Sequence, residues 1–213
     1  MKVKKANYLL VLLLSSVSII VSKTGNILLN VEELYYQSLT VNLTTQQIER
    51  IFEVQKKIEW LYYIIVPIVI LIRTMIISSI IYIGIMLFNY GKIRFNLVWN
   101  NILKAEFIFV LVSIFKIAWF SFFQTNYNLQ DLQYFYPLSV LNIIGYKGLE
   151  TWFIYPFQVL NLFELSYVIY LGFQIGKLTN TNTDYGLKIV GLSYVPSLLL
   201  WVTTVMFFTL NYS

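Results

Sequence analysis

Apolar residues gather in five stretches along the chain, and one long polar stretch separates the first from the rest. The five predicted membrane-spanning helices lie at residues 6–22, 61–90, 106–123, 152–177 and 187–210. A helix needs about 20 apolar residues to cross a hydrocarbon core about 30 Å thick. The pattern therefore predicts an all-α integral membrane helical bundle of about five transmembrane helices, in a single membrane domain covering residues 1–213.

The first apolar stretch has two interpretations. Lysines near the start of the chain precede an apolar run from Tyr8 to Val21, a pattern shared by signal peptides and by first membrane spans. No A-x-A-like cleavage site follows, and Lys23 bounds the run. We favour an uncleaved first span over a cleaved signal peptide.

The polar stretch, residues 23–59, is predicted to be an extracytoplasmic loop that contains one helix. Thr44 and Gln47 match a capping box, and apolar residues then recur at helical spacing. This predicts an amphipathic helix from Thr45 to Trp60. We favour a packed connector for this helix, with a surface that docks a partner as the alternative.

Three charged residues fall inside predicted spans, namely Arg73, Lys116 and Glu164. At 1.5 Å per residue, each lies near the bilayer midplane, where a charge is costly. We therefore expect Glu164 to pair with Lys116 or Arg73 inside the bundle. We favour a purely structural pair that fixes helix register. The alternatives are that the surplus positive charge binds an anionic lipid or solute, and that the charges reach the interface unpaired.

The span at 152–177 also carries polar and small residues at regular spacing. Gln158 and Asn161 precede Glu164 at three-residue steps, which predicts a polar helix face against neighbouring helices. Gly172 and Gly176 form a G-x-x-x-G pair, a close-packing signal for membrane helices. We favour packing within the chain over dimerisation for this pair.

Composition supports the membrane assignment and excludes several kinds of chemistry. The chain is 58% apolar and 12% charged, with a mean hydropathy of +0.70, whereas soluble domains are about 25% charged. It has no cysteine and no histidine, which removes thiolate nucleophiles, the usual general base and the commonest transition-metal ligand. Nucleotide-binding glycine motifs are absent as well. We therefore expect no catalytic residue, no cofactor and no metal site.

The net charge of +5 indicates membrane orientation and lipid contact rather than nucleic-acid binding. The side of the N-terminus would hold these basic residues: Lys2, Lys4, Lys5, Lys92, Arg94, Lys177 and Lys188. The other side mixes basic with acidic residues, so the positive-inside rule places the N-terminus in the cytoplasm. Abundant Ile, Lys, Asn, Tyr and Phe suit an AT-rich genome. We expect a multi-pass protein of the bacterial cytoplasmic membrane.

Three segments of the second half carry a resemblance to a known family. They are PLSVLN at Pro137–Asn142, NLFELSYVIYLGFQIGK at Asn161–Lys177 and GLKIVGLSYVPSLLL at Gly186–Leu200. Over about Tyr136–Leu200, the chain resembles the Yip1-type (Yip1 domain) multi-span membrane proteins, in their bacterial branch. The resemblance implies an α-helical bundle without known catalysis. Eukaryotic members resemble adaptors for small GTPases in vesicle traffic, and some bacterial members look like accessory subunits of ABC-type exporters.

We expect a non-catalytic integral membrane protein, acting as a scaffold or accessory subunit of a membrane complex such as an ABC-type exporter. Its expected partners are the lipid bilayer and other membrane subunits. The alternative is a small-solute or lipid transporter that uses the intramembrane charges, although no pair of interrupted helices is evident in matching positions. An intramembrane enzyme is a third interpretation, without a serine–lysine arrangement around Ser113 or Ser166 to support it.

Overall fold

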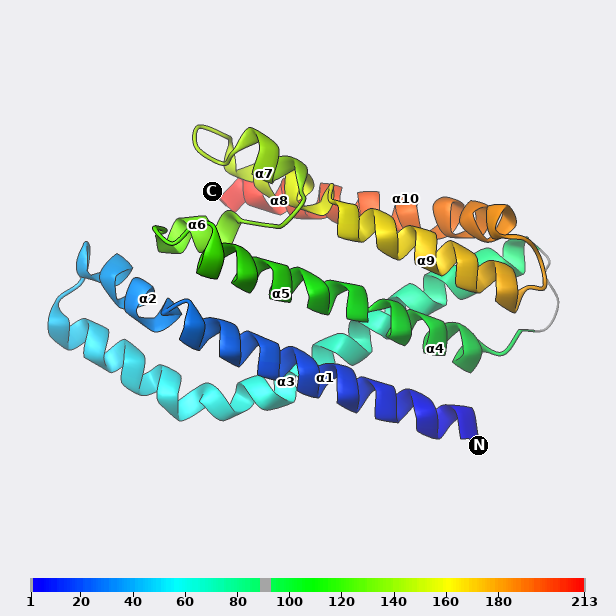
Figure 1. The fold of residues 1–213 in the computed structure, drawn as a ribbon, viewed down its shortest axis with the longest axis horizontal. Helices are drawn as coiled ribbons and strands as arrows, with labels where there is room; N and C mark the ends of the chain where they lie inside the picture. Colours follow the sequence, from blue (N-terminus) through cyan, green and yellow to red (C-terminus); the bar gives the residue numbers. More distant parts are fainter. Residues whose placement is uncertain (1, 89–92, 213) are drawn as a thin grey trace.

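The computed structural model describes residues 2–88 and 93–212, and these residues fold as a bundle of α-helices (Figure 1). The helices are α1 (Lys2–Leu28), α2 (Val31–Thr40), α3 (Thr45–Leu87), α4 (Phe95–Ala105), α5 (Phe107–Phe122), α6 (Leu129–Tyr134), α7 (Val140–Ile144), α8 (Thr151–Val159), α9 (Leu162–Leu178) and α10 (Thr183–Tyr212). No named β-strand occurs among the described residues, so the all-α prediction is confirmed. Lys92, predicted to lie on the same side of the membrane as the N-terminus, falls outside the described residues.

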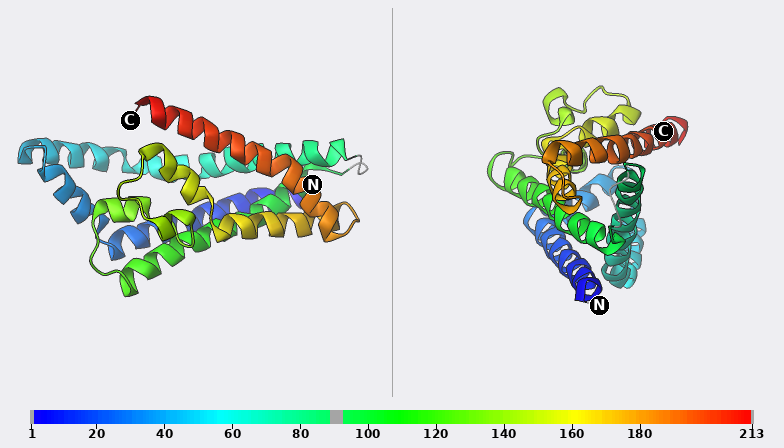
Figure 2. Two further views of the ribbon diagram at one scale, coloured as in Figure 1. Left: turned by 90° about the horizontal axis from the view of Figure 1, so that it is seen from above. Right: turned by 90° about the vertical axis from the view of Figure 1, so that its right-hand side faces the viewer.

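Four helical segments are long and apolar enough to cross a membrane: Val3–Leu28, Thr45–Leu87, Phe95–Phe122 and Thr183–Asn211. This confirms the prediction of a membrane protein at the level of fold class. Helix α9, with 17 residues, is shorter than these four but runs beside α10 in the same bundle (Figures 1 and 2). The N-terminus lies at one end of the bundle. The C-terminus lies at the other end, together with α2, α6, α7 and α8.

Helix α3 is continuous where two elements were predicted. Its 43 residues make it about 64 Å long, roughly twice the thickness of a hydrocarbon core. The predicted capping box at Thr44 is present, and no helix break separates Thr45–Trp60 from the apolar part that follows. Most of the predicted loop at residues 23–59 is therefore helical. Helix α2 packs on this first part of α3 through tyrosine rings that contact Phe52. We refer to α2 and residues 45–60 as the arm.

The segment before Glu106, outside the predicted span at residues 106–123, is the first half of a span-length helical stretch. Val98 and Ile102 in α4 are buried in the main core. The Asn100 side-chain amide donates to the Asn7 side-chain oxygen at 2.8 Å, and Asn7 donates to a main-chain carbonyl of α4 at 2.9 Å. These hydrogen bonds join α1 to α4 and satisfy the polar side chains inside the bundle. Glu106 thus lies between α4 and α5, well inside the stretch Phe95–Phe122.

The predicted span at 152–177 is interrupted. Helix α8 ends at Val159, and α9 begins at Leu162. The Asn161 side-chain oxygen accepts the main-chain N–H of Glu164 at 2.8 Å, which caps the new helix. Main-chain hydrogen bonds to Leu138 and Val140 hold the break against the segment that enters α7. The expectation of one continuous helix is therefore wrong. An interruption would normally expose unpaired backbone groups, but here the cap and the main-chain hydrogen bonds satisfy them.

The main core joins α3, α4, α9 and α10. Its buried members are Ile77, Ile81, Ile85, Val98, Ile102, Ala105, Tyr167, Leu171, Ile175, Ile189, Val190 and Tyr194. Gly172 and Gly176 lie where α9 meets the start of α10. A Cβ added at Gly172 would be 2.5 Å from Leu187 Cδ2, and one at Gly176 would be 2.6 Å from the Asn182 carbonyl oxygen. The glycine pair therefore allows close packing within this chain.

Candidate functional site

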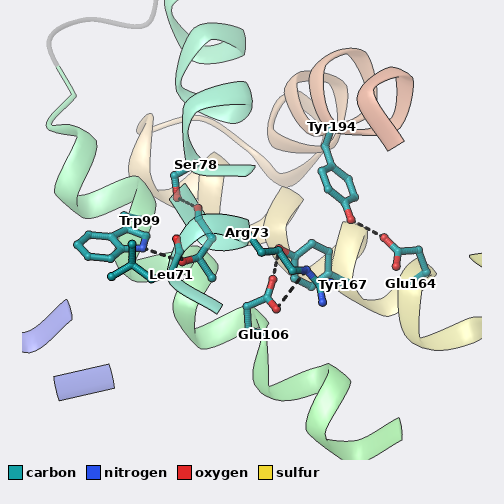
Figure 3. Close-up of polar contacts among 9 residues, drawn as sticks. Leu71, Arg73, Ser78, Trp99, Glu106, Glu164, Tyr167 and Tyr194 are labelled. Carbon is teal, nitrogen blue, oxygen red and sulfur yellow. Dashed lines mark hydrogen bonds and ion pairs between the residues drawn. The ribbon is translucent and has the colours of Figure 1, made fainter. Parts of the chain in front are cut away.

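A group of polar side chains crosses the apolar core (Figure 3). It consists of Arg73 from α3, Glu106 from the α4–α5 junction, Glu164 and Tyr167 from α9, and Tyr194 from α10. We call these five residues the buried polar cluster. Because they come from the elements that form the main core, any change in their contacts would act on the packing of the whole bundle.

Glu106 is the centre of this cluster. Its side chain is 5% exposed, its Oε2 atom lies 3.6 Å from Arg73 Nε, and its Oε1 atom accepts the Tyr167 hydroxyl at 3.1 Å. The Arg73 guanidinium also lies 4.5 Å from the centre of the Phe109 ring. A carboxylate taken out of water loses several kcal/mol of solvation unless it is paired and hydrogen-bonded. Glu106 has both kinds of partner.

Glu164 reaches the cluster through a phenol rather than through a cation. The Tyr194 hydroxyl donates to Glu164 Oε1 at 2.6 Å, and the Tyr194 and Tyr167 rings are 5.5 Å apart. Contacts thus continue from Glu164 through the two tyrosines to Glu106. The predicted ion pair of Glu164 with Lys116 or Arg73 does not occur within the part of the chain that the structure describes. Arg73 is paired with Glu106 instead.

Lys116 lies apart from the buried polar cluster. Its Nζ atom donates to the main-chain carbonyl of Leu132, so it fastens α5 to α6. A long, flexible four-carbon stem lets a lysine side chain reach a carbonyl of another helix. The structure therefore brings two of the three predicted intramembrane charges, Arg73 and Glu164, into one cluster and leaves the third outside it.

The predicted polar face of Gln158 and Asn161 serves the helix break. The Gln158 amide donates to the carbonyl of Tyr134 at 3.0 Å. The Asn161 amide donates to the carbonyls of Gln158 and Val159 at 2.8 and 2.9 Å. Asn161 thus satisfies backbone carbonyls at the end of α8, and Gln158 joins α8 to the end of α6. Both side chains position the start of α9 without entering the cluster.

Sequence reasoning missed Glu106 and the two tyrosines. The predicted span at residues 106–123 begins at Glu106, although buried residues at Val98 and Ile102 precede it at helical spacing. Continuing that spacing across the residue would have placed the carboxylate inside a helix. Tyr167 and Tyr194 carry no such signal, because the chain has 17 tyrosines and nothing in the sequence separates these two from the rest.

A cavity of about 130 Å³ adjoins Arg73 between α1, α3 and α5. Its apolar wall includes Val21, Ile70 and Phe109, and its polar lining is Ser18, Arg73, Glu106 and Ser113. Over the residues searched, 2–88 and 93–212, no group of three or more histidine, cysteine or acidic residues could hold a metal ion. The polar lining of the cavity thus consists of a guanidinium paired with a carboxylate and two hydroxyl groups beside them.

No family model, curated protein or solved structure matches the chain.

Proposed function

We propose that the chain is a non-catalytic membrane subunit, a scaffold or accessory component of a larger membrane complex. The resemblance to Yip1-type proteins makes an ABC-type exporter the leading partner. In this proposal the chain crosses the bacterial cytoplasmic membrane five times, and α8 with α9 forms an interrupted fourth crossing. The N-terminus is cytoplasmic, and the arm is on the outside.

The observation that carries this proposal is the arm. Since α3 is about twice as long as a bilayer core is thick, about half of it extends beyond the membrane. Charged residues are exposed along that half, and Val54 and Ile58 between them are 55% and 49% exposed. Val54 and Ile58 are four residues apart and so lie on the same helix face, where in this proposal a partner covers them.

The buried polar cluster supports the same proposal. Glu106 and Glu164 are partnered by side chains of this chain. Because the Arg73 side chain is 45% exposed, breaking its pair with Glu106 costs less than the about 3–5 kcal/mol of a fully buried pair. Removing Arg73 would still leave the Glu106 carboxylate buried without its cation, so the cluster favours one arrangement of the helices. A subunit that presents a fixed arm to a partner benefits from a bundle held in this way.

Purification from native membranes in mild detergent tests the proposal. We expect an ATPase or a permease to co-purify at fixed stoichiometry, and we expect the double variant Val54→Ser, Ile58→Ser to lose it. Leu87→Ser is the matched control, because Leu87 is also exposed and lies at the opposite end of the same helix. A protein that purifies alone, or a partner lost equally in the control, would refute the accessory role.

Transport of a small solute is the second candidate, and the cavity beside Arg73 is the observation that favours it. Liposomes that contain only this protein distinguish the two candidates. Solute uptake without any partner supports a transporter, whereas an accessory subunit gives no uptake above protein-free liposomes.

A further inference from the structure

We propose that the cavity between α1, α3 and α5 is a binding site for a small oxyanion, with a carboxylate as the best fit, held by the Arg73 guanidinium and the hydroxyls of Ser18 and Ser113. This site does not depend on whether the chain is an accessory subunit or a transporter. Three side chains that line this cavity carry hydrogen-bond donors that no described residue accepts.

The Arg73 guanidinium has hydrogen-bond donors that no described residue accepts. Its contact with Glu106, at 3.6 Å through Nε, is an ion pair longer than a hydrogen bond, and no hydrogen bond joins its guanidinium to any described residue. The side chain is 45% exposed, and it lines the cavity. A guanidinium carries five N–H donors in a planar fork that matches a carboxylate or a phosphate. Inside a membrane, such a group needs acceptors.

The two hydroxyls add to this set from facing helices. Ser18 is on α1 and Ser113 is on α5, and neither hydroxyl has a hydrogen-bond partner among residues 2–88 and 93–212. Ser15 and Ser16, which precede Ser18 on α1, differ from it because their hydroxyls donate to the carbonyls four residues earlier, at 2.7 and 2.8 Å. The hydroxyls at the cavity are therefore available to a ligand.

The position of Glu106 favours an acceptor ligand over a cation. One of its oxygens accepts the Tyr167 hydroxyl and the other faces Arg73 Nε, so the carboxylate is already engaged on both sides. An oxyanion on the open side of the guanidinium would be nearer to the cation than to this carboxylate. Because Coulomb energy falls with distance, attraction to Arg73 exceeds repulsion from Glu106.

The size of the cavity limits the ligand. A buried water needs about 10–15 Å³ of such space, so 130 Å³ holds several waters or one solute of a few heavy atoms. A small carboxylate such as acetate meets this limit with its charged end on Arg73 and its methyl group on the apolar wall. The same chemistry could come from the phosphate of an anionic lipid that enters between the helices.

Thermal unfolding in nanodiscs distinguishes these sources. In phosphatidylcholine nanodiscs, sodium acetate replaces sodium chloride at constant ionic strength, and in a second arm phosphatidylglycerol is added without acetate. A rise of the melting temperature in the first arm identifies a free oxyanion, and a rise in the second arm alone identifies a lipid phosphate. Either result must vanish in Arg73→Gln, since losing a charged hydrogen-bonding partner costs about tenfold or more in affinity.

Two further variants extend the test, and Ser113→Ala keeps it decisive if Arg73→Gln fails to fold, because it leaves the Arg73–Glu106 pair intact. Glu106→Gln removes the competing carboxylate and should tighten acetate or lipid binding. Ser113→Ala should weaken it about threefold, whereas Ser16→Ala, an exposed serine whose hydroxyl is already bonded, should not change it. No stabilisation in either arm would overturn the proposal, as would stabilisation that survives in Arg73→Gln or is unaffected by both Glu106→Gln and Ser113→Ala.

Discussion

The close contact between α9 and α10 predicts that any side chain at Gly186 destabilises the fold. A Cβ added at this position would overlap the carbonyl oxygen of Gly172 and would lie 2.6 Å from the main-chain nitrogen of Gly176. Both are backbone atoms, so neither can rotate away. We expect Gly186→Ala to force α10 away from α9 by about 1 Å, which already forfeits a quarter to a half of the dispersion attraction across a packed surface.

The magnitude follows from two opposing effects. Overpacking a tight contact costs about 1–3 kcal/mol, and the upper value applies because the obstacle is backbone. Replacing a helical glycine by alanine returns about 1 kcal/mol of helix propensity. The net loss for Gly186→Ala is about 2 kcal/mol, which lowers the melting temperature by about 4–8 °C at the scale for soluble domains of this size.

Gly191 provides the matched control, because it lies on the same helix and a Cβ there meets nothing within 4 Å. Gly191→Ala should therefore leave the melting temperature unchanged or raise it, since only the propensity gain of about 0.5–1 kcal/mol remains. The assay is thermal unfolding of both variants in the same nanodiscs. If Gly186→Ala melts at or above the wild-type temperature, or if the two variants fall equally, the close approach of α9 and α10 is refuted.

Three other predictions concern single hydrogen bonds. Thr74→Val removes the hydroxyl that accepts the Trp99 indole N–H at 3.1 Å and should cost about 1–3 kcal/mol in thermal unfolding, whereas Thr74→Ser should cost less because it keeps the acceptor. Asn161→Ala removes the cap of α9 and should cost about 1–2 kcal/mol, with Asn161→Ser as the control that keeps a capping oxygen. The hydrogen bond from Tyr146 to Asp131 raises the pKa of that phenol to about 12, so the stability it adds is complete below pH about 10 and is lost as pH rises through about 12. A tyrosinate absorbance titration of Tyr146→Phe should lack this high-pH step, and an unchanged titration would count against the bond.

The apolar pattern predicted helical structure well but helix lengths poorly. Hydropathy separated residues 45–60 from residues 61–90, yet α3 passes through Trp60 without a break. A change from polar to apolar side chains alters the medium that surrounds a helix and leaves its backbone hydrogen bonds unaffected. Only a local stop signal would have ended the helix, and no glycine lies between Thr45 and Trp60.

The partners of the buried charges could not be predicted from depth alone. Arg73 and Glu164 do lie in one cluster, as their similar depth suggested, but depth says nothing about which way each helix is rotated. Rotation is set by packing, and the packing of α4 places Glu106 opposite Arg73. Glu106 was predicted at the start of a span, but the helical stretch begins at Phe95, so Glu106 lies inside the bundle and can pair there.

The interruption before α9 explains why Glu164 has no ion-pair partner among the described residues. Asn161-Leu-Phe-Glu164 has the spacing of a capping box, a signal that the hydropathy pattern hid, and Asn161 does cap the helix. Glu164 is thereby placed in the first turn of α9, where free N–H groups and the helix dipole favour negative charge by about 0.3–1 kcal/mol. The Tyr194 hydroxyl supplies a further donor at 2.6 Å. A carboxylate in mid-helix would have needed a lysine or an arginine, whereas a carboxylate at a helix start is served by the helix and a phenol.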